Sequence, residues 1–195
     1  MKNFSVFFLV SIFLLAIGYA FDFTATAQKQ TDETNLVSPN IVISQFYGGG
    51  GLAGGVSTAA KSLKEDVRIW GVETEGADAM SLALEAGRPV ELSEITSIAK
   101  TLGAPKVSDM TLEIAKNYLE TVTVVPDSEA VEALRFIAER LKVLTEPAAS
   151  CTLAAAERLR EHFDQDSRVV LILCGGNVSV EDICRYIADA ARAAK

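Results

Sequence analysis

From residue 40 onward, short apolar runs alternate with longer segments in which apolar residues recur every three or four positions. The short runs are apolar on both faces and predict buried strands at residues 40–47, 67–73, 121–125 and 168–173. The longer segments predict helices at residues 51–64, 76–86, 108–119, 127–141, 147–163 and 180–194. This alternation predicts an α/β fold, a parallel sheet with helices on both faces.

Particular residues mark where the helices begin. Ser108 and Ser179 are expected to cap the helices that follow them, and Asp127 to cap the helix that starts there. Pro147 suits a first helical turn, because proline lacks the amide hydrogen that would otherwise stay unpaired. Residues 87–105 carry no regular pattern and are expected to be irregular.

The N-terminal segment differs in composition from the rest of the chain. Lys2 precedes a run over residues 4–21 that is almost entirely apolar, and small residues follow it. We predict a signal peptide or membrane anchor at residues 1–27, with a cleaved secretory signal as the preferred interpretation. A buried hairpin or core helix fits less well, because the run has no polar face.

Residues 28–39 are polar and predict a linker, which leaves residues 40–195 as the folded domain. The leader predicts a secreted or membrane-associated protein. The formal net charge of −8 provides no basic stripe, which argues against a nucleic-acid partner.

The cysteine and histidine content excludes several chemistries. Cys151, Cys174 and Cys184 are widely spaced, and this pattern predicts neither a disulfide framework nor a zinc site. The single histidine, His162, lies in a charged stretch and is expected at the surface. A catalytic triad built on histidine is therefore not available.

A run of four glycines, Gly48 to Gly51, directly follows the first predicted strand and precedes a helix. Amide groups in such a turn converge on one point, where the helix N-terminus adds partial positive charge. This arrangement favours phosphate binding, although a purely structural turn remains an alternative. The run matches neither a Walker A motif nor the dinucleotide fingerprint, but Glu73 at the next strand end keeps a nucleotide-binding oxidoreductase domain as a further alternative.

A second glycine cluster, Cys174-Gly175-Gly176-Asn177, follows the last predicted strand. The carboxyl ends of parallel strands share one edge of a sheet, so this turn and the four glycines are expected to line the same crevice. Cys174 itself is either a small core residue or a functional group of that crevice.

Five motifs in order make the chain similar to the fold-type II pyridoxal-phosphate (PLP) enzymes of the L-serine/L-threonine dehydratase family. They lie at residues 47–52, 70–77, 95–103, 146–148 and 174–177. The resemblance covers residues 40–192 and implies part of the large domain of a tryptophan synthase β-like fold. Members convert serine to pyruvate or threonine to 2-oxobutanoate with release of ammonia.

The resemblance also implies site residues. The cofactor phosphate would be bound by Gly48, Gly49, Gly50, Gly51 and Leu52, and Cys174 would approach the pyridine nitrogen. A cation such as K⁺ would be bound by Glu73 and by carbonyl groups at Ala77, Leu102 and Ala104. Ala79 lacks the side-chain oxygen usual at its position, and Glu73 could instead cap the next helix.

Fold-type II catalysis needs a lysine that forms the Schiff base, carried in the family by a Ser-x-Lys-x-Arg-Gly segment upstream of the glycine run. That motif does not occur in this sequence, so no catalytic residue is assigned. We expect a truncated dehydratase that is inactive alone. Its expected protein partner is a second copy of the chain, in a homodimer, or a complementing N-terminal half chain. The alternative is an exported, non-catalytic module that binds phosphate or PLP.

Overall fold

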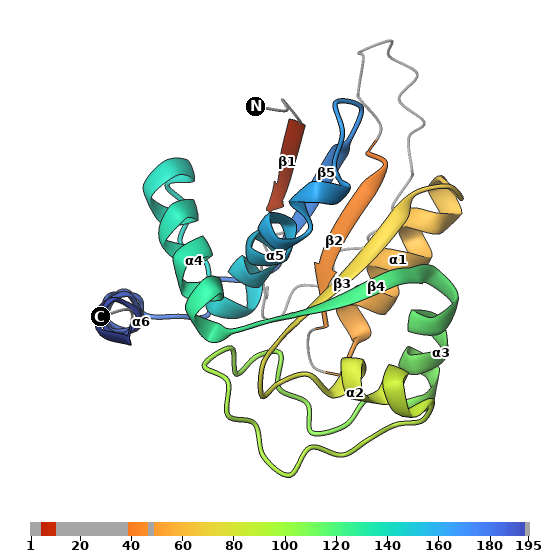
Figure 1. Cartoon of the computed structure of the whole chain (residues 1–195), viewed down its shortest axis with the longest axis horizontal. Coiled ribbons are helices and arrows are strands. Elements are labelled where there is room, and N and C mark those ends of the chain that lie inside the picture. The colour runs from red at the N-terminus through yellow and green to blue at the C-terminus, as the bar shows by residue number, and fades with distance from the viewer. Residues whose placement is uncertain (1–4, 11–38, 47–48, 194–195) are drawn as a thin grey trace, which may run out of the picture.

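The computed structural model describes residues 5–10, 39–46 and 49–193 and contains one parallel sheet of five strands in the order β1-β5-β2-β3-β4 (Figure 1). The strands are β1 (Ser5–Val10), β2 (Ile41–Gln45), β3 (Arg68–Thr74), β4 (Leu119–Val125) and β5 (Arg168–Leu173). The helices are α1 (Gly51–Leu63), α2 (Ala79–Ala86), α3 (Asp109–Tyr118), α4 (Asp127–Leu141), α5 (Pro147–Arg158) and α6 (Val180–Ala193).

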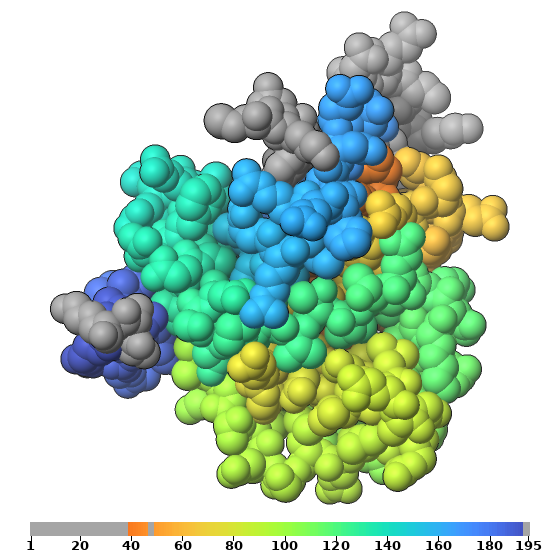
Figure 2. Space-filling model, viewed as in Figure 1, coloured from red at the N-terminus to blue at the C-terminus, as the bar shows by residue number. Residues whose placement is uncertain are grey.

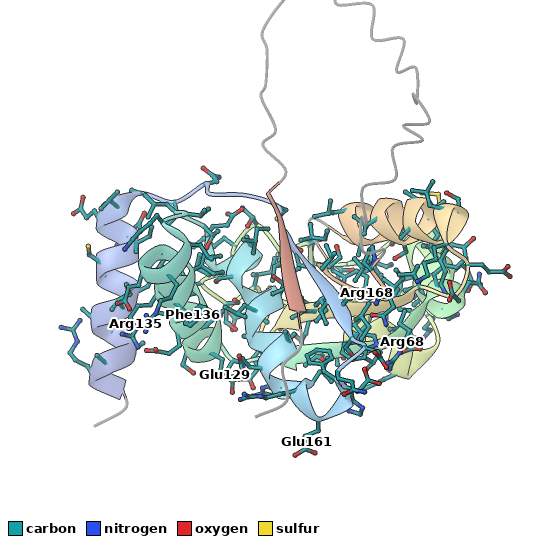
Figure 3. All side chains as sticks on the ribbon, turned by 90° about the horizontal axis from the view of Figure 1, so that it is seen from above. Arg68, Glu129, Arg135, Phe136, Glu161 and Arg168 are labelled. Atoms are coloured by element: carbon teal, nitrogen blue, oxygen red, sulfur yellow. The ribbon has the colours of Figure 1, made fainter. Side chains whose placement is uncertain are left out.

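Helices cover both faces of the sheet, which confirms the predicted α/β architecture. α1, α2 and α3 lie on one face, whereas α5 crosses the other face against β2, β3, β4 and β5. α4 packs on the outer side of α5, and α6 packs on α4. Seen from above, α4 lies between α5 and α6, with Arg135 and Phe136 on α4 (Figure 3).

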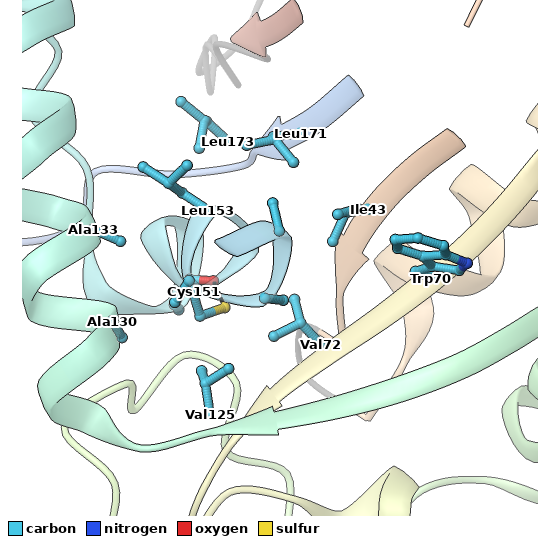
Figure 4. Packing of buried hydrophobic residues seen from close by; sticks show 14 of the residues in the cluster. Ile43, Trp70, Val72, Val125, Ala130, Ala133, Cys151, Leu153, Leu171 and Leu173 are labelled. Carbon is cyan, nitrogen blue, oxygen red and sulfur yellow. Dashed lines mark hydrogen bonds between the residues drawn. The ribbon is translucent and has the colours of Figure 1, made fainter. Parts of the chain in front are cut away.

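The inner strands β2, β3 and β5 are largely buried on both faces because their side chains alternate between two apolar layers. Ile41 and Ile43 of β2 belong to the layer that contains α5, whereas Val42 packs with α1 on the other side. In the first layer, Cys151 of α5 lies near Val72 of β3 (Figure 4). This two-sided burial explains why these inner strands are largely apolar, whereas β4 at the edge exposes Glu120 and Thr121.

The small side chains of α5 let this helix approach the sheet closely. Every residue from Pro147 to Ala156 is buried, and most are alanine or another small residue. Ser150 donates a hydrogen bond to the carbonyl oxygen of Ala130 on α4, at 2.6 Å. α5 is thus a central helix between the sheet and α4, not a surface helix.

The predicted strand over residues 168–173 is confirmed, and the other predicted elements differ mainly at their ends. Ser108 and Ser179 accept hydrogen bonds from the amides three residues on, as expected of N-caps. The prediction that Asp127 caps α4 was wrong, because Asp127 is the first helical residue and its carboxylate instead accepts hydrogen bonds from Ser97 and Ile98. The predicted helix over residues 147–163 ends at Arg158, where a short 3₁₀ turn follows.

Ser5–Val10, within the predicted leader, forms β1 and pairs in parallel with β5 at the edge of the sheet. This strand lies upstream of residue 40, where the folded domain was expected to begin. The rest of the predicted leader and nearly all of the predicted linker lie outside the described residues, so the leader and its location stay predictions. Among the helices described, none has the length and apolar character needed to cross a membrane.

Candidate cofactor site

The carboxyl ends of the strands meet at the edge of the sheet nearest to α2, where the predicted site residues gather. β2 points toward this edge and continues into the glycine run (Figure 1). β3 ends there in Glu73 and Thr74, and β5 continues into Cys174 and Gly175. The irregular segment before α3 closes this end of the molecule as one continuous mass in the space-filling view (Figure 2).

The glycine run turns sharply between β2 and α1, and its conformation requires glycine. Gly49 and Gly50 have φ angles of 86° and 98°, in the left-handed region that other residues rarely adopt. A Cβ atom on Gly50 would lie 3.2 Å from Met80 Cε and 3.2 Å from Thr111 Cβ. The turn is therefore pressed against α2 and α3. Gly48 lies outside the described residues.

The N-terminus of α1 is open and carries no competing negative charge. Gly50 is the N-cap residue, no side chain from the described residues caps the helix, and the first turn contains no acidic residue. A Cβ atom on Gly51 would meet nothing within 4 Å. The amide groups of this turn lack intrahelical partners and provide a site suited to an anion. Leu52 follows and packs half-buried toward the sheet.

Cys174 stands at the end of β5 on the same edge. Burial raises the pKa of its thiol to about 11, and the negative charge of Glu146 acts in the same direction. The side chain of Gln45 next to it lowers that pKa without cancelling the effect of burial. The Cys174 thiol is therefore neutral at physiological pH and can exchange hydrogen bonds with a ring nitrogen.

Buried polar atoms without hydrogen-bond partners concentrate around this edge. Among the described residues they are Ser44 Oγ, the Gln45 amide nitrogen and oxygen, Thr145 Oγ1 and Glu146 Oε1. Ser44 and Gln45 end β2, and Thr145 and Glu146 precede α5. Each unpaired atom costs about 1–3 kcal/mol. Their concentration at one place is typical of a site whose polar partner is a ligand.

Glu73 caps the helix that follows it. Its two carboxylate oxygens accept hydrogen bonds from the amides of Met80, at 3.0 Å, and Ser81, at 2.8 Å. Burial raises the pKa of Glu73 to about 7, although the two hydrogen bonds that its carboxylate accepts from these amides favour the charged form. The alternative of a helix-capping carboxylate is thus realised in the structure.

Of the other predicted cation-binding residues, Ala104 lies beside the glycine run. A Cβ atom on Gly49 would lie 3.5 Å from Cβ of Ala104. Leu102 is buried, and its carbonyl oxygen accepts a hydrogen bond from the amide of Ala104 at 2.9 Å. Ala77 is buried near the start of α2. The described part of the chain has no group of three or more His, Cys, Asp or Glu side chains able to hold a metal ion.

Comparison with known proteins identifies the class to which this sheet edge belongs. Residues 22–175 match the family described as "Pyridoxal-phosphate dependent enzyme". The chain belongs to this family, in its fold-type II branch of serine and threonine dehydratases.

Two curated relatives illustrate the similarity. A serine dehydratase-like protein of Mus musculus is 42% identical over 161 residues, which cover 78% of this chain and 49% of the relative. The phenylserine dehydratase of Ralstonia pickettii is 38% identical over 141 residues, which cover 72% and 43%. The chain therefore spans just under half the length of these two relatives.

Solved structures agree with the fold. A fungal L-serine ammonia-lyase from Rhizomucor miehei matches with a TM-score of 0.72 and 29% identity, covering 78% of this chain and 50% of the other. Maize serine racemase matches with a TM-score of 0.68 and 28% identity, covering 79% and 49%. In both comparisons this chain covers about half of the longer solved structure.

The residues present fit a phosphorylated pyridine ring. The glycine run offers an open anion site, and the neutral Cys174 thiol offers a partner for a ring nitrogen. Sequence reasoning missed Gln45 and Thr101 and gave Glu146 no role. The signal for Gln45 is a polar residue at the end of a buried strand, and the signal for Glu146 is a glutamate directly before a fully buried helix.

Replacing Gly50 by alanine is expected to destabilise the protein by about 1–3 kcal/mol, because alanine is strained at this φ angle and its Cβ meets Met80 and Thr111. Urea unfolding measures the effect. Gly55→Ala is the matched control: Gly55 is exposed within α1 with open space around it, so alanine there stabilises by about 0.5–1 kcal/mol. Equal effects of the two substitutions would contradict the geometry described for the loop.

The raised pKa of Cys174 predicts slow alkylation, since at pH 8 about one thiol in a thousand is ionised at a pKa near 11. Iodoacetamide is expected to modify the exposed Cys184 at least about tenfold faster than Cys174, because the thiolate is the reactive form. The fully buried Cys151 stays unmodified. Peptide mass spectrometry over time gives the three rates, and alkylation of Cys174 as fast as Cys184 would show that its thiol is not held neutral.

Proposed function

We propose that this chain binds pyridoxal 5′-phosphate at the carboxyl edge of its sheet and forms the phosphate- and ring-binding part of an L-serine or L-threonine dehydratase. The observation that carries the proposal is that the open glycine turn at Gly49–Gly51 and the Cys174 thiol follow the paired parallel strands β2 and β5 at the same edge of the sheet. Family membership supports the cofactor, and the relatives' names support an amino-acid substrate.

Each part of the site would have a distinct task. The amides of Gly49–Gly51 and of the first turn of α1 would hold the phosphate, where the partial positive charge of the helix end favours an anion. The neutral thiol of Cys174 would contact the ring nitrogen and leave it uncharged. When bound, the cofactor supplies the electron sink that β-elimination from serine or threonine requires.

The lysine that elimination requires would come from outside the matched motifs. No Ser-x-Lys-x-Arg-Gly segment occurs in this sequence, and the lysines that the structure describes lie on helices or loops of other segments. We therefore propose that this chain binds the cofactor reversibly and that turnover needs a complementing segment that carries the lysine.

We also propose a monovalent cation near Glu73, at the carbonyl groups of Ala77, Leu102 and Ala104. Its support is the burial of Glu73 and Leu102 and the contact of Ala104 with the glycine run. A cation there would offset the negative charge of Glu73 and would fix the loop that lies against Gly49.

The binding proposal is tested with pyridoxine 5′-phosphate, a cofactor analogue that cannot form a Schiff base with surface lysines. We expect saturable binding by calorimetry, and a loss of at least about tenfold in affinity for Gly51→Asp, which places a carboxylate in the anion site. Gly51→Asn, of the same size without the charge, should bind more tightly than Gly51→Asp. Failure of the wild-type chain to bind, or equal binding by both variants, would contradict the proposal.

Turnover separates the catalytic and the binding interpretations. With pyridoxal phosphate and serine or threonine, the chain alone is expected to release no pyruvate or 2-oxobutanoate. Borohydride reduction should likewise attach no cofactor to a single lysine in one-to-one ratio, because no lysine in this chain is expected to form the Schiff base. Measurable turnover by this chain alone would overturn the need for a complementing segment.

The cation proposal predicts a rise of the melting temperature in KCl relative to tetramethylammonium chloride at equal ionic strength, because a ligand that binds only the folded state stabilises it. Glu73→Gln should abolish this difference by removing the charge. Differential scanning fluorimetry measures both proteins. Equal melting temperatures of the wild-type chain in the two salts would exclude a potassium site.

A further inference from the structure

Glu146 is a buried residue whose backbone is hydrogen-bonded but whose carboxyl group has a hydrogen-bond partner at only one of its two oxygens. Its side chain and backbone together are 3% exposed. It is the N-cap residue of α5, yet its side chain makes no capping hydrogen bond. Its backbone is paired instead: the Glu146 amide donates a hydrogen bond to the carbonyl oxygen of Gly175 at 3.2 Å.

The two oxygens of this carboxyl group have different surroundings. Oε2 accepts a hydrogen bond from the hydroxyl group of Thr101 at 2.9 Å. Oε1 is buried and has no hydrogen-bond partner among the described residues. Thr101 therefore fixes the orientation of the group and leaves Oε1 available to a third partner.

Oε1 is directed at the turn that follows β5. A Cβ atom built on Gly175 would lie within van der Waals overlap of Oε1, so glycine at this position leaves the oxygen uncovered. Gly175 directly follows Cys174, and the charge of Glu146 influences the thiol of Cys174. The free oxygen thus lies in the ring part of the proposed cofactor site, apart from the phosphate part at the glycine turn.

An unpartnered carboxyl oxygen in such a place has a cost that some interaction must offset. Burial without a partner costs about 1–3 kcal/mol and more for a charged group. Burial also raises the pKa of Glu146, and only the hydrogen bond from Thr101 opposes this. Alanine at this position would avoid the cost, and no capping bond of the side chain explains why glutamate is present.

We propose that Glu146 is a ring-positioning residue of the cofactor site, whose Oε1 forms a hydrogen bond with a polar substituent or ring atom of the bound pyridine while Thr101 holds Oε2. This inference rests on the proposed binding of pyridoxal phosphate. It assigns the ligand contact to the start of α5, in addition to the glycine turn and the turn after β5.

The test compares two ligands that share a phosphate. Pyridoxine 5′-phosphate carries the ring, whereas inorganic phosphate engages the glycine turn alone. Glu146→Ala is expected to weaken pyridoxine phosphate binding about tenfold, the effect of one hydrogen bond to a carboxyl group, and to leave phosphate affinity within about twofold. Calorimetry measures the first ligand and the phosphate dependence of the melting temperature measures the second.

Two further variants separate ligand contact from a structural role. Glu146→Gln keeps the size and the hydrogen-bonding capacity, so we expect it to bind pyridoxine phosphate within about threefold of wild type. Thr101→Val leaves Glu146 in place without its anchor and should give an intermediate loss. Glu157→Gln, an exposed glutamate on the same helix, should bind both ligands as wild type does.

The possible outcomes are distinct. Binding of pyridoxine phosphate by wild type and Glu146→Ala with equal affinity would overturn the role of Glu146 and leave the proposed function standing. An equal loss of both ligands in Glu146→Gln would mean that Glu146 supports the fold and does not contact the ring. Failure of wild type to bind pyridoxine phosphate would overturn both proposals.

Discussion

The close packing of α5 beneath the sheet is the constraint on which the candidate site depends. Its small buried residues bring the helix against four strands at once, and the backbone hydrogen bond between Glu146 and Gly175 joins its N-cap residue to the turn after β5. The parallel strands then place the glycine turn of β2 at the same edge. A larger side chain along α5 would separate these elements, and the polar groups at the edge would no longer face one space.

The strands and most helices could be predicted because their patterns are local. The apolar run of β5 and the cap at Ser108 are examples, since each is decided by a few neighbouring residues. The position of the Asp127 side chain could not be predicted, because distant partners decide it. Asp127 turns away from its own helix toward Ser97, and tertiary contacts set this preference.

The same distinction holds for the site. The motifs of the glycine run and of Cys174 gave these residues a role, whereas Glu146 and Thr101, although they lie in motifs, received a role only through burial and hydrogen bonding. Gln45 lies outside the motifs and became visible only through its unpaired atoms. The chain spans about half of the relatives it matches, and its polar edge contains atoms that no described residue satisfies. The unsatisfied atoms support the proposed cofactor site, and the proposal assigns the catalytic lysine to another segment.

Hydrogen–deuterium exchange with and without pyridoxine 5′-phosphate tests most directly whether two distant segments form one site. We predict that the ligand slows exchange in peptides covering residues 49–54 and residues 172–177 together, because the phosphate contacts the first turn and the ring contacts the second. Protection of the glycine turn alone, with residues 172–177 unchanged at saturating ligand, would contradict the account. That result would mean that the ligand binds through its phosphate alone and that the ring does not contact the turn after β5.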